Sequence, residues 1–249
     1  MFINKKVFFR FYSLFFIFLM PVYCYSQDPK LTEDWSVKPE VVIPGKKFSP
    51  PSDALVLFDG SDFSKWSGQD GEVQWKIKGK AMEVVKGTGS IKTVQPFGNI
   101  QFHVEWRTPR KIEDKEKGQG KGNSGVYIMG LYEVQILDSW ENETYYNGQA
   151  GSIYKQHIPL VNACKKPGKW QTYDIIFRAP EFNEDKTLKN PVFITVIHNG
   201  ILIQDHVELK GPTVFVGYPE YQFHEEKLPL LLQNHGNTVE YRNIWIREL

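Results

Sequence analysis

The sequence predicts an all-β fold, a sandwich or barrel made of roughly a dozen short strands. Apolar and polar residues alternate in short runs that Gly, Asn and Pro interrupt. After the N-terminal segment, no window keeps the i, i+3, i+4, i+7 apolar spacing of a helix. Hydrophobic residues make up 41% of the 249 residues, which is ample for one core. We therefore expect a single globular domain over residues 54–249.

The first 26 residues have the pattern of a secretory signal peptide. A basic segment, residues 5–10, precedes an apolar run at residues 11–22 and a short polar exit that allows cleavage after Ser26. We expect an exported protein, periplasmic or secreted, with no membrane span in its mature chain. A lipid anchor at Cys24 is the alternative, which Tyr23 disfavours because lipidation sites need a small residue there.

Residues 27–53 are rich in proline and lack periodicity, which predicts an extended N-terminal arm. The run 73–85, VQWKIKGKAMEVV, predicts a hairpin around its Lys-Gly-Lys turn. The run 196–203, VIHNGILI, predicts another hairpin with the Asn199-Gly200 turn at its tip. The charged, glycine-rich segment 110–123 is expected to form a loop at the rim of a site.

Charge composition bears on the class of partner. The chain has 30 basic and 29 acidic side chains, a formal net charge of +1. A nucleic-acid-binding protein would show a basic stripe, so we expect no nucleic-acid partner. Once Cys24 is removed, Cys164 is the only cysteine, and no intramolecular disulfide can form.

Polar residues recur in pairs at strand positions. Glu133 and Gln135 share one face of the run LYEVQILDSW, about 6 to 7 Å apart along the strand. Gln233 and His235 have the same spacing, and Glu105 pairs in the same way with His103 and Arg107 on the polar face of the run 99–109. Each pair alone fits a solvated sheet face, whereas three pairs in a chain rich in Trp and Tyr favour a shared polar groove.

An ordered series of motifs resembles the 3-keto-disaccharide hydrolase family. The series is LFDG (57–60), VEWR (104–107), GNSGVYIM (122–129), YEVQILDS (132–139), QAGSIY (149–154), KPGKWQTYDI (166–175), LQNHG (232–236) and VEYRNIWIREL (239–249). The resemblance implies a jelly-roll β-sandwich of two antiparallel sheets, like that of concanavalin A and the laminarinases. It also implies an enzyme that cleaves 3-keto-glycosides, as a lyase or as a net hydrolase, and a partner oxidoreductase that makes the 3-keto sugar.

The implied chemistry assigns roles to the polar residues. A ketone at C3 acidifies the C2 proton, so the site needs a base, donors for the C3 oxygen and an acid for the leaving group. Glu133 is the expected base, and His235 the expected acid or base, since imidazole titrates near neutral pH. The residues expected to bind the sugar are Glu105, Asn123, Gln135, Tyr154, Gln156 and Gln233. A divalent cation held by Glu133, His235 and Glu105 would also suit this set.

Two alternative functions share the fold. A retaining glycosidase of the laminarinase type needs two carboxyl groups about 5 to 5.5 Å apart. In this strand Gln135 stands where such enzymes have the middle acid, and Asp138 falls on the face opposite Glu133. The second alternative is a non-catalytic carbohydrate-binding module, which would keep the groove without a base. Lys155 departs from the family's usual glycine and leaves the roles of Tyr154 and Gln156 open.

Overall fold

A computed structural model describes residues 28–110 and 117–249. The expected signal peptide and Cys24 lie outside the described residues. The chain divides into two compact units, with the boundary in the sequence between Val41 and Val42. The described part of the first unit holds one 3-10 helix, η1 (Pro29–Thr32), which the Asp28 side chain caps through the backbone N–H of Lys30. No helix in the described ranges has the length and apolar character needed to cross a membrane.

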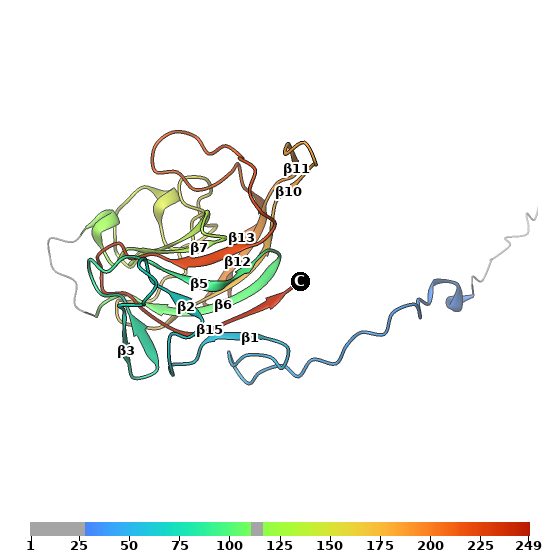
Figure 1. Ribbon diagram of the computed structural model, residues 1–249, viewed down its shortest axis with the longest axis horizontal. Helices are drawn as coiled ribbons and strands as arrows, with labels where there is room; N and C mark the ends of the chain where they lie inside the picture. Colours follow the sequence, from blue (N-terminus) through green and yellow to red (C-terminus); the bar gives the residue numbers. More distant parts are fainter. Residues whose placement is uncertain (1–27, 111–116) are drawn as a thin grey trace, which may run out of the picture. The chain divides into compact units, whose positions relative to one another are not determined.

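The second unit is the predicted jelly-roll β-sandwich of two antiparallel sheets (Figure 1). The larger sheet has eight strands in the order β13-β12-β9-β6-β15-β4-β3, with β1 also paired to β15. Its strands are β1 (Leu55–Phe58), β3 (Lys76–Lys78), β4 (Ala81–Glu83), β6 (Ile100–Arg107), β9 (Gln171–Arg178), β12 (Phe193–His198), β13 (Ile201–Glu208) and β15 (Glu240–Glu248).

The smaller sheet has five strands in the order β2-β5-β14-β7-β8. They are β2 (Trp66–Ser67), β5 (Ile91–Phe97), β7 (Ser124–Ile128), β8 (Tyr132–Ile136) and β14 (Leu228–Leu232). A separate hairpin joins β10 (Glu181–Phe182) to β11 (Leu188–Asn190), and two further 3-10 helices are η2 (Gly118–Gly120) and η3 (Tyr146–Gly148).

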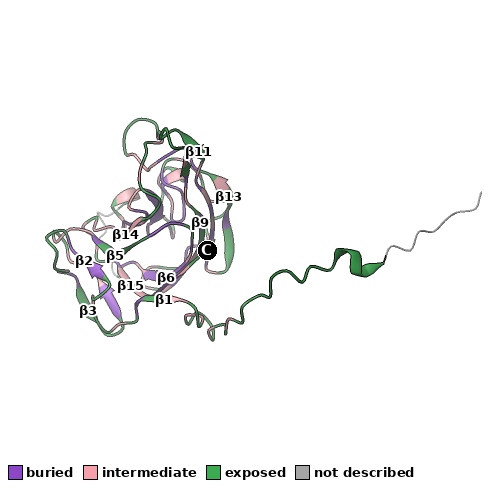
Figure 2. Ribbon diagram, turned by 45° about the vertical axis from the view of Figure 1, so that its right-hand side comes forward, coloured by how far each residue is buried: buried purple, intermediate pink, exposed green. Residues whose placement is uncertain are grey.

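Alternation along the strands creates the core between the two sheets. Phe102 and Val104 of the larger sheet and Val126 and Val134 of the smaller sheet are fully buried in one cluster. Figure 2 shows the same pattern, with buried strand segments in purple and the exposed strand β11 in green. The Tyr173 hydroxyl donates a hydrogen bond to the Gln135 carbonyl at 2.8 Å, which joins the sheets in the interior.

Both predicted hairpins are present. β3 pairs antiparallel with β4, and β12 pairs with β13 around a turn in which Asn199 and Gly200 have φ of 54° and 81°. Positive φ at both central residues is the type I′ geometry, whose twist suits the flanking strands.

The second half of the N-terminal arm belongs to the sandwich unit, since that unit begins at Val42. The Phe48 ring stacks on His103 at 5.7 Å between ring centroids. The Phe48 carbonyl accepts hydrogen bonds from the side chains of Asn243 and Trp245 at 2.8 and 3.2 Å. These contacts fix residues 42–53 on the outer face of the larger sheet.

Cys164 is a free cysteine in the loop before β9. Its side chain belongs to the core and is only 8% exposed, and the Gln171 side chain contacts its sulfur at 3.5 Å. Burial raises the pKa of the Cys164 thiol to about 11, so the group is a neutral packing element at neutral pH.

Candidate active site

A cavity of about 600 Å³ opens on the outer face of the smaller sheet. Val126, Ile128 and Val134 point into the core, so their alternate neighbours on β7 and β8 point to the other side of that sheet. The cavity is lined by Gln119, Gly120, Asn123, Tyr127, Glu133, Gln135, Tyr145, Tyr154, Thr213, Phe215, Gln233 and His235. The floor is formed by strands and the walls by loops.

Glu133 is the charged group on the floor. The side chain is buried, with the residue only 3% exposed, and burial raises the pKa of its carboxyl group to about 7. A hydrogen bond from Tyr127, its register partner on β7, acts in the opposite direction and lowers the pKa of Glu133. A carboxyl group with this pKa is half ionised near neutral pH, which suits a general base.

Gly125 makes room for the carboxylate. A Cβ atom at this position would lie 2.5 Å from Glu133 Oε1 and 2.9 Å from the Tyr127 ring. A side chain at this position would therefore displace the Glu133 carboxylate or the Tyr127 ring, and glycine lets both keep their places. The alternation of Gly125 and Tyr127 thus complements Glu133 on the neighbouring strand.

Uncharged amides surround Glu133 and leave acceptors unused. Gln135 is 1% exposed, and its Nε2 donates to Gln119 Oε1 at 2.9 Å while its own Oε1 has no partner. Gln233 Nε2 donates to the Tyr127 hydroxyl at 3.3 Å, and Gln233 Oε1 also has no partner. Unpaired buried acceptors are costly, so a ligand that donates hydroxyl groups would compensate both.

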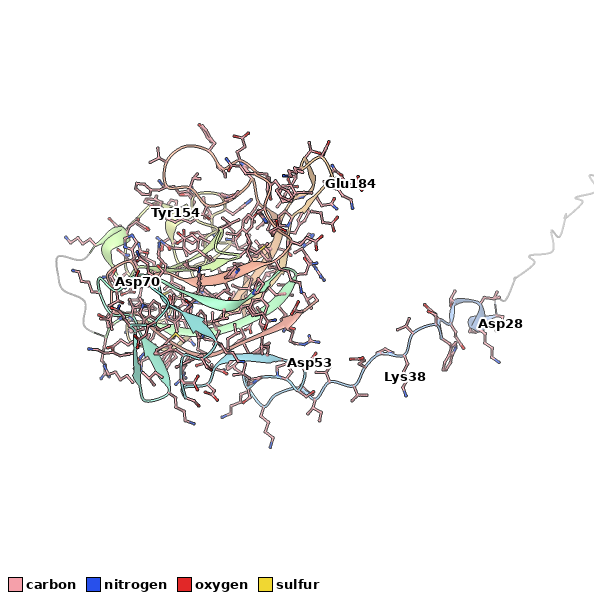
Figure 3. All side chains as sticks on the ribbon, viewed as in Figure 1. Asp28, Lys38, Asp53, Asp70, Tyr154 and Glu184 are labelled. Carbon is pink, nitrogen blue, oxygen red and sulfur yellow. The ribbon has the colours of Figure 1, made fainter. Side chains whose placement is uncertain are left out.

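Loops fasten the walls to the floor. The Thr213 hydroxyl accepts a hydrogen bond from the Glu133 backbone N–H at 3.0 Å, which ties the long β13–β14 loop to β8. The Tyr145 and Tyr154 hydroxyls are 2.5 Å apart. Figure 3 labels Tyr154 beneath the β13–β14 loop, which also brings Phe215 to the cavity. Asn123, 4% exposed, donates from Nδ2 to the Gln119 carbonyl at 2.7 Å.

Comparison with known proteins places the chain in a family. A family model described as a 3-keto-alpha-glucoside-1,2-lyase-like domain matches residues 53–247. The chain belongs to the 3-keto-alpha-glucoside-1,2-lyase-like family. This confirms the resemblance to the 3-keto-disaccharide hydrolases.

Two crystal structures from Parabacteroides distasonis resemble this member of the 3-keto-alpha-glucoside-1,2-lyase-like family. One, described as a candidate glycosyl hydrolase, is 43% identical in sequence and covers 92% of this chain and 100% of its own, with a TM-score of 0.86. Another protein of the same description is 20% identical over 79% of this chain and 94% of its own, with a TM-score of 0.56, and shows the fold alone. No curated protein matches the sequence.

In this 3-keto-alpha-glucoside-1,2-lyase-like domain, five of the predicted site residues line the cavity with Glu133. They are His235, Asn123, Gln135, Tyr154 and Gln233. His235 follows β14 and is exposed at the mouth of the cavity, where it is open to a ligand and to solvent. Glu133 and Gln135 are buried beneath the loops, so the solvated-face alternative does not apply to them.

Glu105 was predicted to bind the sugar with Glu133, but it does not line this cavity. It lies on β6 of the larger sheet, whose outer face is on the opposite side of the sandwich. Its carboxylate accepts hydrogen bonds from Arg242 Nε at 2.7 Å and Asn243 Nδ2 at 3.0 Å. The predicted cation site of Glu133, His235 and Glu105 is therefore not assembled. Within the described residues, no three His, Cys, Asp or Glu side chains form a group that could hold a metal ion.

Gln156 lies beside the Glu133 cavity without lining it. Its amide accepts from the Lys210 backbone N–H at 2.8 Å and donates to the Gly211 carbonyl at 3.0 Å. It therefore anchors the start of the β13–β14 loop and lines a neighbouring cavity.

Several residues that line the cavity were not among the predicted site residues. Tyr127 lies on β7, four residues after Asn123 and on the same side of the sheet, so a period of two in GNSGVYIM could have identified it. Gln119 lies in the rim loop that was expected at residues 110–123; residues 111–116 of that loop lie outside the described ranges. Thr213 and Phe215 come from a segment without periodicity, where no local signal was available.

Proposed function

We propose that the protein cleaves 3-keto-glycosides by removing the C2 proton and eliminating the C1 substituent. The observation that supports this proposal is the buried carboxyl group of Glu133, with a pKa of about 7, on the floor of a cavity lined by uncharged hydrogen-bonding groups. Membership of the 3-keto-alpha-glucoside-1,2-lyase-like family supports the same substrate class.

In the proposed reaction, the Glu133 carboxylate takes the C2 proton, and the C2–H electron pair forms an enolate with the C3 ketone. The enolate re-forms the ketone, a C1–C2 double bond appears, and the C1–O bond breaks with its electron pair on the leaving oxygen. His235, at the mouth, is the proposed donor of the proton that this oxygen takes up. Addition of water across C1–C2 then gives the free 3-keto sugar, so the net reaction is hydrolysis.

The surrounding amides are assigned to substrate positioning. Gln135 and Gln233 offer the two unpaired acceptor oxygens to the hydroxyl groups of the sugar. Asn123 and the side-chain N–H groups of the cavity wall are the proposed donors to the developing enolate oxygen. Because these groups are already held by partners in the protein, little reorganisation is needed when charge moves from C2 to the C3 oxygen.

The arrangement of carboxyl groups disfavours direct glycoside hydrolysis by the retaining mechanism. Among the described residues that line the cavity, Glu133 is the only carboxylic acid. Asp138 follows β8 on the other side, where its carboxylate pairs with Lys121 at 3.3 Å and accepts from the Trp140 backbone N–H at 3.1 Å. Retaining enzymes need a second carboxyl group about 5 to 5.5 Å from the first.

We further propose that the protein works after export, downstream of an oxidoreductase. The N-terminal 26 residues have the signal-peptide pattern. An oxidising step at C3 must precede the elimination, because an unoxidised glycoside has no acidic C2 proton.

The deciding experiment compares a 3-keto-glucoside with its unoxidised parent, each with and without a chelator. The purified protein is expected to release the aglycone from the keto compound alone. Glu133→Gln should remove this activity, whereas Glu184→Gln, an exposed carboxylate on the β10–β11 turn, should not. Cleavage of the parent would indicate a conventional glycosidase. Binding of the keto compound without cleavage would indicate a carbohydrate-binding module.

A further inference from the structure

We propose that a second cavity beside Glu133 binds the leaving group and that Lys155 gives it a preference for an aglycone carrying a carboxylate. The inference rests on the proposed function, because it assigns the leaving group of that same reaction. Two observations support it: the second cavity adjoins the first, and the charge of Lys155 in its lining has no counter-ion among the described residues.

The second cavity adjoins the first. It measures about 290 Å³, and Tyr145 and Tyr154 line both cavities. The hydrogen bond between their hydroxyls, at 2.5 Å, forms the shared wall. A glycoside whose C2 lies over Glu133 can therefore extend its C1 substituent across the two tyrosines into the second cavity.

The charge in the second cavity is not balanced. Lys155 is the only charged side chain among the described residues lining it. No described carboxylate lies within ion-pair distance of the Lys155 ammonium group. The rest of the lining consists of amides, tyrosines, proline, valine and glycine, so a carboxylate brought by a ligand would be the natural counter-ion.

The Lys155 ammonium group is held in place. Its Nζ donates to the Phe215 carbonyl at 2.5 Å and lies 4.2 Å from the centre of the Phe215 ring. The same atom lies 5.9 and 5.7 Å from the ring centres of Tyr145 and Tyr154. One of three N–H donors is thus used, and the fixed geometry leaves little side-chain entropy to be lost on pairing with a ligand.

Lys155 also has an unfavourable backbone conformation. Its φ is 59°, in the left-handed region that glycine adopts without strain and that costs other residues about 1 kcal/mol or more. Strain of this kind persists where the surrounding structure enforces it, as at ligand sites. A purely structural clamp to the β13–β14 loop is the competing explanation, and it predicts no dependence on ligand charge.

Exposed rings define the remaining chemistry of the aglycone. Tyr218, 95% exposed, and Pro219 line the outer part of the second cavity. Flat apolar surfaces of this kind stack on rings. The fitting leaving group is therefore a ring bearing a carboxylate, which an aromatic acid or a uronic acid would each supply.

The test uses matched pairs of 3-keto-glucosides. The aromatic pair has 3-hydroxybenzoate or its amide as aglycone, and the sugar pair has glucuronic acid or its amide. For each pair, the kcat/KM ratio of acid to amide is measured in the wild type and in Lys155→Met, Lys155→Gly and Lys155→Arg. Dividing the wild-type ratio by the variant ratio cancels the intrinsic reactivity of the two leaving groups.

The wild-type ratio is expected to exceed the Lys155→Met and Lys155→Gly ratios by about two- to fivefold, the effect of one partly exposed charge pair. Lys155→Arg should retain the preference. Lys186→Met is the matched control, because Lys186 also has positive φ (67°) and an aromatic neighbour, Phe223, yet lies on the β10–β11 turn.

The outcomes are distinct. A larger effect in the aromatic pair or in the sugar pair identifies the source of the carboxylate. Equal ratios in wild type and Lys155→Met, with active enzyme, would overturn the second-cavity proposal and leave the proposed function intact. No cleavage of any 3-keto-glucoside by the wild type would instead refute the proposed function.

Discussion

Replacing Glu133 with glutamine should make the protein inactive and, above neutral pH, more stable. Burial raises the pKa of Glu133 from 4.5 to about 7. The folded state therefore binds the proton more tightly than the unfolded state, and the free energy of unfolding of the wild type falls as pH rises from about 4.5 to about 7. A shift of this size corresponds to about 3 kcal/mol, and the group is 3% exposed, so solvent screening is small.

Glutamine keeps the shape and has no charge to bury. The free energy of unfolding of Glu133→Gln relative to wild type should thus rise by about 3 kcal/mol between pH 4 and pH 8. Urea denaturation of both proteins across this range measures the difference. A difference that does not vary with pH would refute the argument from burial.

Activity provides the second measurement on the same pair. The wild-type kcat/KM for a 3-keto-glucoside should rise with pH up to about 7, as the Glu133 carboxylate forms. Loss of the base should lower kcat/KM by about 10²- to 10⁴-fold. A stable Glu133→Gln protein with near-wild-type activity would show that the base lies elsewhere.

Three further substitutions test the surroundings of Glu133. Gly125→Ala should lower kcat/KM at least about tenfold, because its Cβ would lie 2.5 Å from Glu133 Oε1; wild-type kinetics would mean that the carboxylate can move without consequence. Tyr127→Phe removes the hydrogen bond that lowers the Glu133 pKa, so the midpoint of the pH–kcat/KM curve should move to higher pH, and a shift to lower pH would contradict this. Glu105→Gln should leave kcat/KM within about twofold of the wild-type value. It should lower the free energy of unfolding by about 1 kcal/mol, because the contact with Arg242 is weakened. A large loss of activity with unchanged stability would show that Glu105 takes part in the reaction.

The fold could be predicted from the sequence because its signal is local. Alternation of apolar and polar residues identifies the strands. The Asn199-Gly200 turn identifies a hairpin whichever sheet its strands join. The same alternation placed Glu133 and Gln135 on one face and Asp138 on the other. Alternation along a strand does not indicate which of the two sheets the strand joins. The run that carries Glu105 alternates just as clearly, but it belongs to the larger sheet. The prediction that Glu105 shares a groove with Glu133 was therefore wrong.

The walls of the site could not be predicted in the same way. Thr213 and Phe215 reach the cavity through a long loop whose path depends on contacts such as the one between Thr213 and the Glu133 backbone. Such contacts join residues far apart in the chain and leave no periodic trace. Burial of Glu133 also depends on these loops, so its raised pKa is a property of the assembled site alone.

Because the buried Cys164 thiol reacts slowly, a single fluorescent label can be attached to another cysteine introduced beside the site. A thiol that is 8% exposed, with a pKa of about 11, reacts slowly with maleimide or iodoacetamide at neutral pH. In a protein produced without residues 1–26, a cysteine introduced at the exposed Tyr218 would take up the fluorophore selectively, with the native thiol left in place. The emission of that probe would then follow ligand entry beside Lys155 in real time, even with substrates that the enzyme does not turn over.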